Sequence, residues 1–197
     1  MSASIRRGRP GYDQQGILAI SVAAFNEFGY EATSMGMLAE RLGLSKAAIY
    51  HHVASKEELL SLALDQALGA LEGVLDEPEA QVGGAGERLT HVVRRAVHVL
   101  VAELPSVTLL LRVRGNTEVE RSALERRRRF DRAVAGLVVA AADEGWLRPE
   151  LDPRLAERLV FGMINSIVEW YRPDGDADAL ADTVVAIAVD GLRAPDA

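Results

Sequence analysis

The sequence predicts an all-α protein of about nine helices, a small three-helix head at the N-terminus followed by a larger helical body. Apolar residues recur at intervals of three and four along most of the 197 residues, and no segment alternates as a strand does. Aromatic residues make up only 5%, whereas Ala, Leu and Val are abundant, and this composition favours helices over a β-sandwich. The chain contains no cysteine, which excludes disulfides, thiolate nucleophiles and cysteine-ligated zinc.

Capping residues divide the head into short helices. Residues 17–28 place their apolar side chains on one face, and Gly29 closes the pattern. A second pattern begins near Ser34 and stops at Gly43, and a third, short one runs from residue 45 to about residue 53.

The fourth helix is predicted to open at Ser55. Glu58 follows three residues later, so the pair forms the sequence signature of a capping box, and the apolar pattern continues through Leu71. Beyond Pro78, a glycine-rich stretch at residues 83–86 predicts a surface loop. Helical patterns then resume at residues 87–103, from about 109 after a break at Pro105, and at residues 118–143, 152–171 and 177–192.

The charge is unevenly distributed along the chain. Residues 1–56 carry six basic and four acidic side chains, whereas residues 57–197 carry 16 basic and 25 acidic ones, within a total of −7. Both lysines of the chain lie in the first segment. This asymmetry indicates a head that binds a polyanion on a body that repels it.

The two short patterns around Gly43 have the spacing of a helix-turn-helix. In such a unit the second helix lies in the major groove of DNA. Ile49 and Val53 are expected to point inward. The outer side is then shared by Lys46, Ala47, Tyr50 and His51. Spacing alone also fits two ordinary core helices with a solvated face, and that alternative stays open at this point.

The residues themselves resemble the TetR family of bacterial transcriptional regulators. The resemblance rests on residues 29–34 (GYEATS), 42–53 (LGLSKAAIYHHV) and 55–60 (SKEELL), about a quarter of the chain. It implies a three-helix DNA-binding domain, a fourth connecting helix, and a body that binds a ligand and dimerises. Gly36 and Met37 depart from the family's usual polar or charged residues, and Val53 from its usual aromatic. The family's DNA contacts would fall on Thr33, Ser34, Ser45, Lys46, Ala47, Tyr50, His51 and Lys56.

An arginine-rich arm precedes the first helix. Arg6, Arg7 and Arg9 surround a glycine before Pro10, and such an arm can enter a narrow minor groove. A basic tail without a DNA contact is the alternative. The domain prediction is therefore an arm at residues 1–11, a DNA-binding domain at 12–55, and a ligand-binding and dimerisation domain at 56–197.

The last two helical patterns carry apolar stripes that the resemblance implies to be a dimer face. Residues of the chain's own core would give the same stripes, but a protein that reads a palindrome needs a twofold partner. The sequence therefore predicts a homodimer. The stripes comprise Leu155, Leu159, Met163, Ser166, Trp170, Leu180, Val184, Ile187, Ala188 and Gly191.

The body also contains an arginine run, residues 126–129, with Arg112 and Arg114 upstream. A solvated helix face explains it, and so does a site for a phosphate-bearing effector. The region from residue 114 to 130, together with residues 165–173, is similar to TetR regulators that sense acyl-CoA thioesters. The predicted ligand-binding residues are Leu110, Arg114, Arg128, Phe130, Phe161, Asn165 and Trp170.

The leading prediction is a cytoplasmic, ligand-responsive TetR repressor that binds a palindromic double-stranded DNA operator as a homodimer and is released by a small molecule such as an acyl-CoA thioester. A constitutive dimeric DNA-binding protein is the alternative. No catalytic constellation, cofactor site or membrane segment is apparent, so an enzyme is not expected. His91 and His98 are seven residues apart, a spacing unsuited to a shared metal ion, and no metal site is expected.

Overall fold

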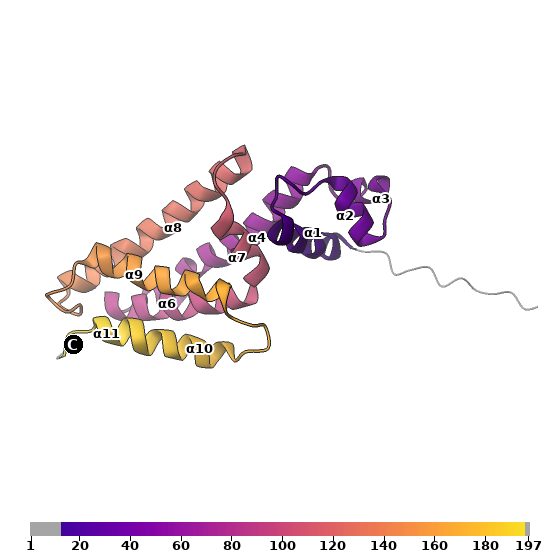
Figure 1. The fold of residues 1–197 in the computed structure, drawn as a ribbon. Helices are drawn as coiled ribbons and strands as arrows, with labels where there is room; N and C mark the ends of the chain where they lie inside the picture. The colour runs from indigo at the N-terminus through magenta and orange to yellow at the C-terminus, as the bar shows by residue number, and fades with distance from the viewer. Residues whose placement is uncertain (1–12, 196–197) are drawn as a thin grey trace, which may run out of the picture. The chain divides into compact units, whose positions relative to one another are not determined.

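The computed structural model describes residues 13–195, and all regular elements in this part of the chain are helical (Figure 1). An isolated bridge joins Leu147 to Arg193. The all-α prediction is therefore confirmed for the described residues. None of the helices among these residues combines the length and the apolar character that a bilayer span requires.

The chain divides into two compact units, the first ending at Ala63 and the second beginning at Leu64. The boundary falls inside α4 (Lys56–Asp76), so one continuous helix belongs to both units. Each unit is described here by itself.

The first unit packs α1 (Gln14–Phe28), α2 (Met35–Leu42) and α3 (Lys46–Tyr50) with the start of α4. α2 contacts both α1 and α3. Its core consists of apolar side chains that the sequence pattern places on inward faces. These include Ile17, Phe25, Leu38, Ile49 and Leu59, all 2% exposed or less.

The predicted caps are present in the first unit. The Ser34 hydroxyl accepts a hydrogen bond from the Met37 N–H at 3.2 Å, and the Ser55 hydroxyl accepts one from the Glu58 N–H at 3.0 Å. Gly43 ends α2 with φ of 64°, a left-handed conformation that is costly for other residues. These local contacts explain why the first helix ends could be read from sequence.

The second unit is built around α6 (Ala85–Ala102), which contacts α5, α7, α8, α9 and α10. Val92, Val93 and Val97 on this helix have no exposed surface, consistent with its central position. The other helices are α5 (Pro78–Gln81), α7 (Leu104–Arg112), α8 (Glu118–Asp143), α9 (Pro153–Ser166), α10 (Ala177–Val184) and α11 (Asp190–Leu192).

Several helix ends differ from the prediction. Pro105 was expected to break the helical pattern until about residue 109, but α7 starts at Leu104 and carries the proline in its first turn, where a missing N–H costs no hydrogen bond. α9 stops at Ser166 and passes into a 3-10 turn, Ile167–Glu169, before the expected end at residue 171. α3 ends at Tyr50, earlier than expected.

Candidate DNA interface and ligand cavity

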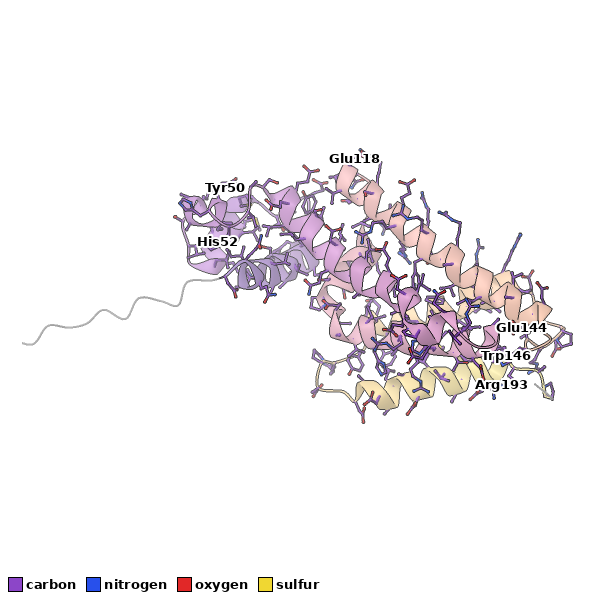
Figure 2. The ribbon with its side chains drawn as sticks, turned by 180° about the vertical axis from the view of Figure 1, so that it is seen from behind. Tyr50, His52, Glu118, Glu144, Trp146 and Arg193 are labelled. Atoms are coloured by element: carbon purple, nitrogen blue, oxygen red, sulfur yellow. The ribbon has the colours of Figure 1, made fainter. Side chains whose placement is uncertain are left out.

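α3 exposes one face and buries the other. Ile49 has no exposed surface, whereas Lys46 and Ala47 are exposed and Tyr50 retains 49% of its surface (Figure 2). Ser45 caps the helix, because its hydroxyl accepts a hydrogen bond from the Ala48 N–H at 3.1 Å. Six of the predicted DNA-contacting residues are exposed on the first unit, namely Ser34, Ser45, Lys46, Ala47, Tyr50 and His51.

Gly36 on α2 leaves room for Lys46 on α3. A Cβ atom at Gly36 would lie 3.2 Å from Cε and 3.4 Å from Nζ of Lys46. A larger side chain at this position would displace the lysine. The glycine at position 36 therefore lets the end of the Lys46 side chain lie close to α2.

Lys56 is tied to the turn after α1. Its Nζ donates a hydrogen bond to the Tyr30 carbonyl oxygen at 2.9 Å and lies 4.2 Å from the centre of the Tyr30 ring. The lysine is half-buried. An ammonium group has three donors, so the bond to Tyr30 leaves donors for a phosphate while limiting where that phosphate can sit.

The structure changes the interpretation of Thr33. Its side chain is 1% exposed, and the hydroxyl donates to the Gly29 carbonyl oxygen at 2.8 Å. Its N–H is bonded to the same turn. Burial therefore opposes the predicted side-chain contact to DNA, and Thr33 holds the turn between α1 and α2. The predicted arm residues Arg6, Arg7 and Arg9 lie outside the described residues.

The second unit contains a partly open cavity of about 40 Å³. Side chains from α4, α6, α7, α8 and α9 line it, and most of them are aliphatic. Four of the predicted ligand-binding residues are among them. These are Leu110, Phe130, Phe161 and Asn165.

The other three predicted ligand residues lie elsewhere. Arg114, Arg128 and Trp170 do not line the cavity and are exposed. Arg127 and Asp131 line it instead. The two residues are four apart on α8 and flank Phe130, a spacing that places them on one helix face and that could have identified them from sequence.

The arginine run on α8 is not one surface. Arg126 donates to Glu72 and also pairs with Asp65, both on α4. Arg127 lines the cavity, and Arg128 and Arg129 are exposed. The run therefore combines a helix-to-helix contact, a cavity residue and a solvated face.

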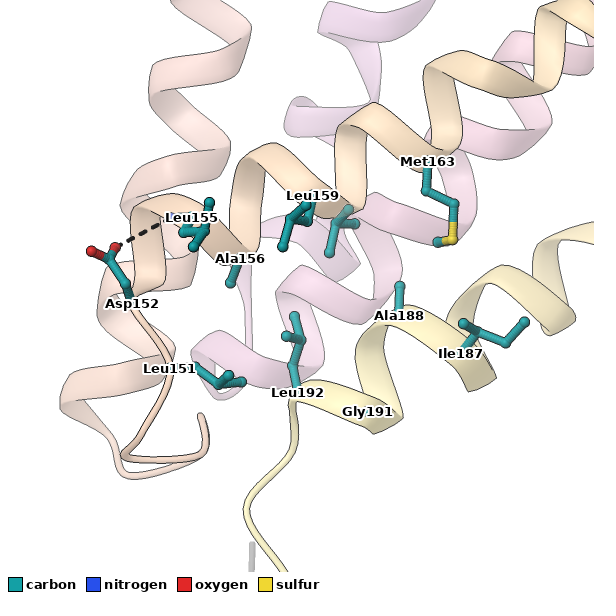
Figure 3. Close-up of a pocket in the computed structure, with 11 residues that line it drawn as sticks. Leu151, Asp152, Leu155, Ala156, Leu159, Met163, Ile187, Ala188, Gly191 and Leu192 are labelled. Carbon is teal, nitrogen blue, oxygen red and sulfur yellow. Dashed lines mark hydrogen bonds between the residues drawn. The ribbon is translucent and has the colours of Figure 1, made fainter.

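An apolar groove of about 280 Å³ runs between α9 and the C-terminal helices (Figure 3). Leu155 and Leu159 on α9 are 57% and 66% exposed, and Ile187 on the facing segment is 65% exposed. The segment that carries Ile187 is a single π-helical turn, Val185–Val189. Val184, which the sequence placed on the dimer stripe, is instead buried in the core of its own unit.

Two family models match the chain. One describes bacterial regulatory proteins of the tetR family and covers residues 17–63. The other describes a tetracyclin repressor-like C-terminal domain and covers residues 82–192, more than half of the chain. The chain belongs to the TetR family of bacterial regulatory proteins. It is a DNA-binding transcriptional regulator, and the first model spans the helix-turn-helix described above.

Relatives of this TetR-family regulator extend along nearly the whole chain. A TetR-family transcriptional regulator from Streptomyces coelicolor A3 is 52% identical, with 98% of this chain and 96% of that chain covered and a TM-score of 0.85. The fatty acid metabolism regulator protein of Bacillus subtilis (strain 168) is 25% identical over 96% of this chain and 99% of its own length. AibR in complex with isovaleryl coenzyme A and operator DNA has the same fold, with 24% identity, 89% and 98% coverage and a TM-score of 0.73.

The cavity of this TetR-family regulator has an unusual carboxylate. Burial raises the pKa of Asp131, and the positive charges of Arg127 and Arg132 act in the opposite direction. Burial likewise raises the pKa of Glu157, and the charge of Asp131 adds to that effect. Among residues 13–195, His, Asp and Glu side chains form no group of three or more that could hold a metal ion.

Proposed function

We propose that this TetR-family regulator is a cytoplasmic homodimeric repressor that binds a palindromic operator and is released by an acyl-CoA thioester. The observation that carries the proposal is the cavity, because its lining includes α4 as well as α8 and α9. α4 is also part of the unit that holds the helix-turn-helix. A ligand that separates the cavity walls therefore acts on the helix that continues into the DNA-binding unit. The protein acts by binding and not by catalysis.

α3 is the proposed recognition helix. Its small Ala47 would permit close approach to base edges, and the exposed Tyr50 and His51 are proposed to contact phosphates. Ser34, Ser45 and Lys56 add contacts that orient the unit on the backbone, and Lys46 adds a positive charge. Arg6, Arg7 and Arg9 are proposed to enter the minor groove beside the half-site.

The apolar groove between α9 and the C-terminal helices is the proposed dimer face. Three large apolar side chains, Leu155, Leu159 and Ile187, stand exposed around it, and exposed apolar patches mark interaction sites. A second copy of the chain is the proposed occupant because a palindrome is read by a twofold pair. The same surface would then be buried on both protomers.

Effector release requires a difference in affinity between two states. The effector must bind the conformation that fails to fit the operator more tightly than the conformation that fits it, since otherwise no equilibrium shifts. A volume of about 40 Å³ holds little more than a water molecule or two, so an acyl chain has to move the walls apart. The bound state therefore differs from the one described here, as the mechanism demands.

A constitutive dimeric DNA-binding protein is the second candidate function. The small volume of the cavity favours it, because a well-packed body that only dimerises needs no ligand space. That candidate and the effector-controlled repressor differ in one measurable property, the effect of a thioester on operator affinity.

The test is a titration of the protein's own upstream intergenic DNA at fixed salt, with and without isovaleryl-CoA or octanoyl-CoA, after the dimer has been measured by native mass spectrometry. We expect a thioester to lower operator affinity at micromolar concentration. Val107→Trp fills the cavity and should abolish that response while DNA binding persists, whereas Val139→Trp, on an exposed part of α8, should not. A response to no thioester in the unmodified protein would favour the constitutive candidate.

The dimer is tested separately. Leu159→Glu places a charge on the groove and should shift the protein to monomers and weaken operator binding. Val82→Glu alters an equally exposed apolar residue outside the groove and is the matched control. An unchanged mass for Leu159→Glu would remove the groove as the dimer face.

A further inference from the structure

Three polar side chains interrupt the otherwise apolar lining of the cavity. Fourteen residues line it, of which eleven are Ala, Val, Leu, Ile or Phe. The remaining three are Arg127 and Asp131 on α8 and Asn165 on α9. All three belong to the wall that α8 and α9 form together.

None of the hydrogen bonds and ion pairs found between residues 13 and 195 involves these three side chains, although the charges of Arg127 and Arg132 act on Asp131. The neighbouring Arg126, in contrast, donates to two carboxylates on α4. The three side chains are half-buried, so solvent reaches them, and a ligand that displaces this solvent has to supply hydrogen bonds in its place. The wall therefore offers a ligand the donors and acceptors of Arg127, Asp131 and Asn165.

The packing of α8 against α9 brings the three polar side chains to the same part of the cavity wall. Arg127 and Asp131 are one helical turn apart and share a face of α8. Phe130 of α8 and Phe161 of α9 meet edge to face with ring centres 5.9 Å apart, and Asn165 follows one turn after Phe161. The aromatic pair holds the two helices together where the polar residues lie.

The three residues differ in what they can bind. Arg127 only donates hydrogen bonds, an ionised Asp131 only accepts them, and the amide of Asn165 does both. A hydrocarbon chain uses none of these groups. A ligand carboxylate would meet the carboxylate of Asp131 as well as the guanidinium of Arg127, so a neutral ligand group fits better.

We propose that this wall recognises a hydroxyl group placed near the carbonyl of the ligand's acyl chain. Arg127 donates to the carbonyl oxygen, Asp131 accepts from the hydroxyl, and Asn165 bonds to the hydroxyl oxygen. The inference rests on the acyl thioester of the proposed function and narrows it to a hydroxyacyl thioester.

The test compares octanoyl-CoA with 3-hydroxyoctanoyl-CoA by isothermal titration calorimetry of the full-length protein. We expect the hydroxylated thioester to bind about tenfold more tightly, since the analogue without the hydroxyl leaves polar groups of the wall unpaired. Asp131→Leu should remove this preference and bind the saturated thioester at least as well as the unmodified protein does. That retained binding shows that the variant folds. Asp143→Leu, an exposed carboxylate at the end of the same helix, should keep the preference.

Two results would overturn the inference. One is equal affinity of the unmodified protein for both thioesters, and the other is a preference that survives Asp131→Leu. Binding of neither thioester would instead count against the thioester effector of the proposed function. In that case the affinities for methyl octanoate and methyl 3-hydroxyoctanoate are compared, which tests the hydroxyl preference without coenzyme A. Equal affinity for the two esters, or binding of neither, overturns the hydroxyl preference as well.

Discussion

Arg126 on α8 binds Glu72 on α4 through two parallel hydrogen bonds, from Nε to Oε1 at 3.0 Å and from Nη2 to Oε2 at 2.7 Å. Such a bidentate pair has a defined geometry as well as opposite charges. The Arg126 guanidinium also pairs with Asp65, about two turns before Glu72 on α4. The contact holds together two helices that line the cavity, next to the residue, Arg127, that faces it.

Removing this contact should loosen α8 from α4. We expect Arg126→Ala to lower the free energy of unfolding by about 1 kcal/mol, since the pair is partly exposed and screened by solvent. Denaturant unfolding followed by circular dichroism measures the loss. Arg128→Ala changes an exposed arginine of the same run and should have little effect, and equal losses for both variants would contradict the assigned role of Arg126.

Gly86 is the position where Trp146 packs onto α6. A Cβ atom at Gly86 would lie 2.4 Å from three atoms of the Trp146 indole ring. The guanidinium carbon of Arg193 lies over the same ring, 5.4 Å from its centre, and Figure 2 labels both side chains. Gly86→Ala should therefore destabilise the protein by about 1–3 kcal/mol, because the ring must move. The melting temperature measures this loss.

The matched control is Gly73→Ala on α4, where a Cβ atom meets nothing within 4 Å. Alanine is the better helix former, so this change should stabilise the protein by up to about 1 kcal/mol. The same substitution is thus expected to destabilise the protein at Gly86 and to stabilise it at Gly73. Equal effects at the two sites would show that the indole ring adapts without cost.

Glu120 organises the turn before α8. Its buried carboxylate accepts hydrogen bonds from the backbone N–H groups of Arg114, Gly115 and Asn116 at 3.0, 2.7 and 2.9 Å. All three bonds reach Oε2, so Glu120→Gln can keep an oxygen there but loses the negative charge, and it should lower the free energy of unfolding by about 1–2 kcal/mol. Glu118→Gln, an exposed neighbour, serves as the control in the same denaturant titration. Retained stability in Glu120→Gln would mean that the negative charge adds nothing to these three hydrogen bonds.

The Arg95 guanidinium, and then the His91 ring, hold the pKa of Glu77 below its ordinary value of 4.5. Burial acts in the opposite direction but has a smaller effect on this pKa than the Arg95 hydrogen bond. Because the folded-state pKa is lowered, the contact stabilises the protein above the unfolded pKa and is lost as pH falls through the folded one. We expect stability to decline below about pH 4.5 and Glu77→Gln to flatten that part of the profile. Melting temperatures between pH 3 and pH 6 test this, and an unchanged profile would contradict it.

Tyr50 is assigned to a DNA phosphate through its hydroxyl. Tyr50→Phe should weaken operator binding by roughly five- to tenfold, uniformly across operator variants, because a phosphate contact carries no sequence information. Stability should not change, since the side chain is half exposed. Tyr171→Phe removes a hydroxyl that donates to the Gly175 carbonyl oxygen in the second unit, and it should leave DNA affinity unchanged. A loss confined to one base position would reassign Tyr50 to base readout.

The sequence by itself determined the helical class, most helix ends in the first unit and the outward face of α3. These follow from contacts between residues three or four apart, such as Ser34 with Met37 or Ser55 with Glu58, and such contacts are visible in the order of residues. Tertiary structure decided the rest. Thr33 is buried because its hydroxyl bonds to the turn after α1, and Val184 is buried because it packs in the core of its own unit. In the arginine run, it is Arg126 that pairs with acidic residues of α4. Asp131 and Arg127 face a cavity because α9 covers that side of α8, and no local spacing records which helix covers which face.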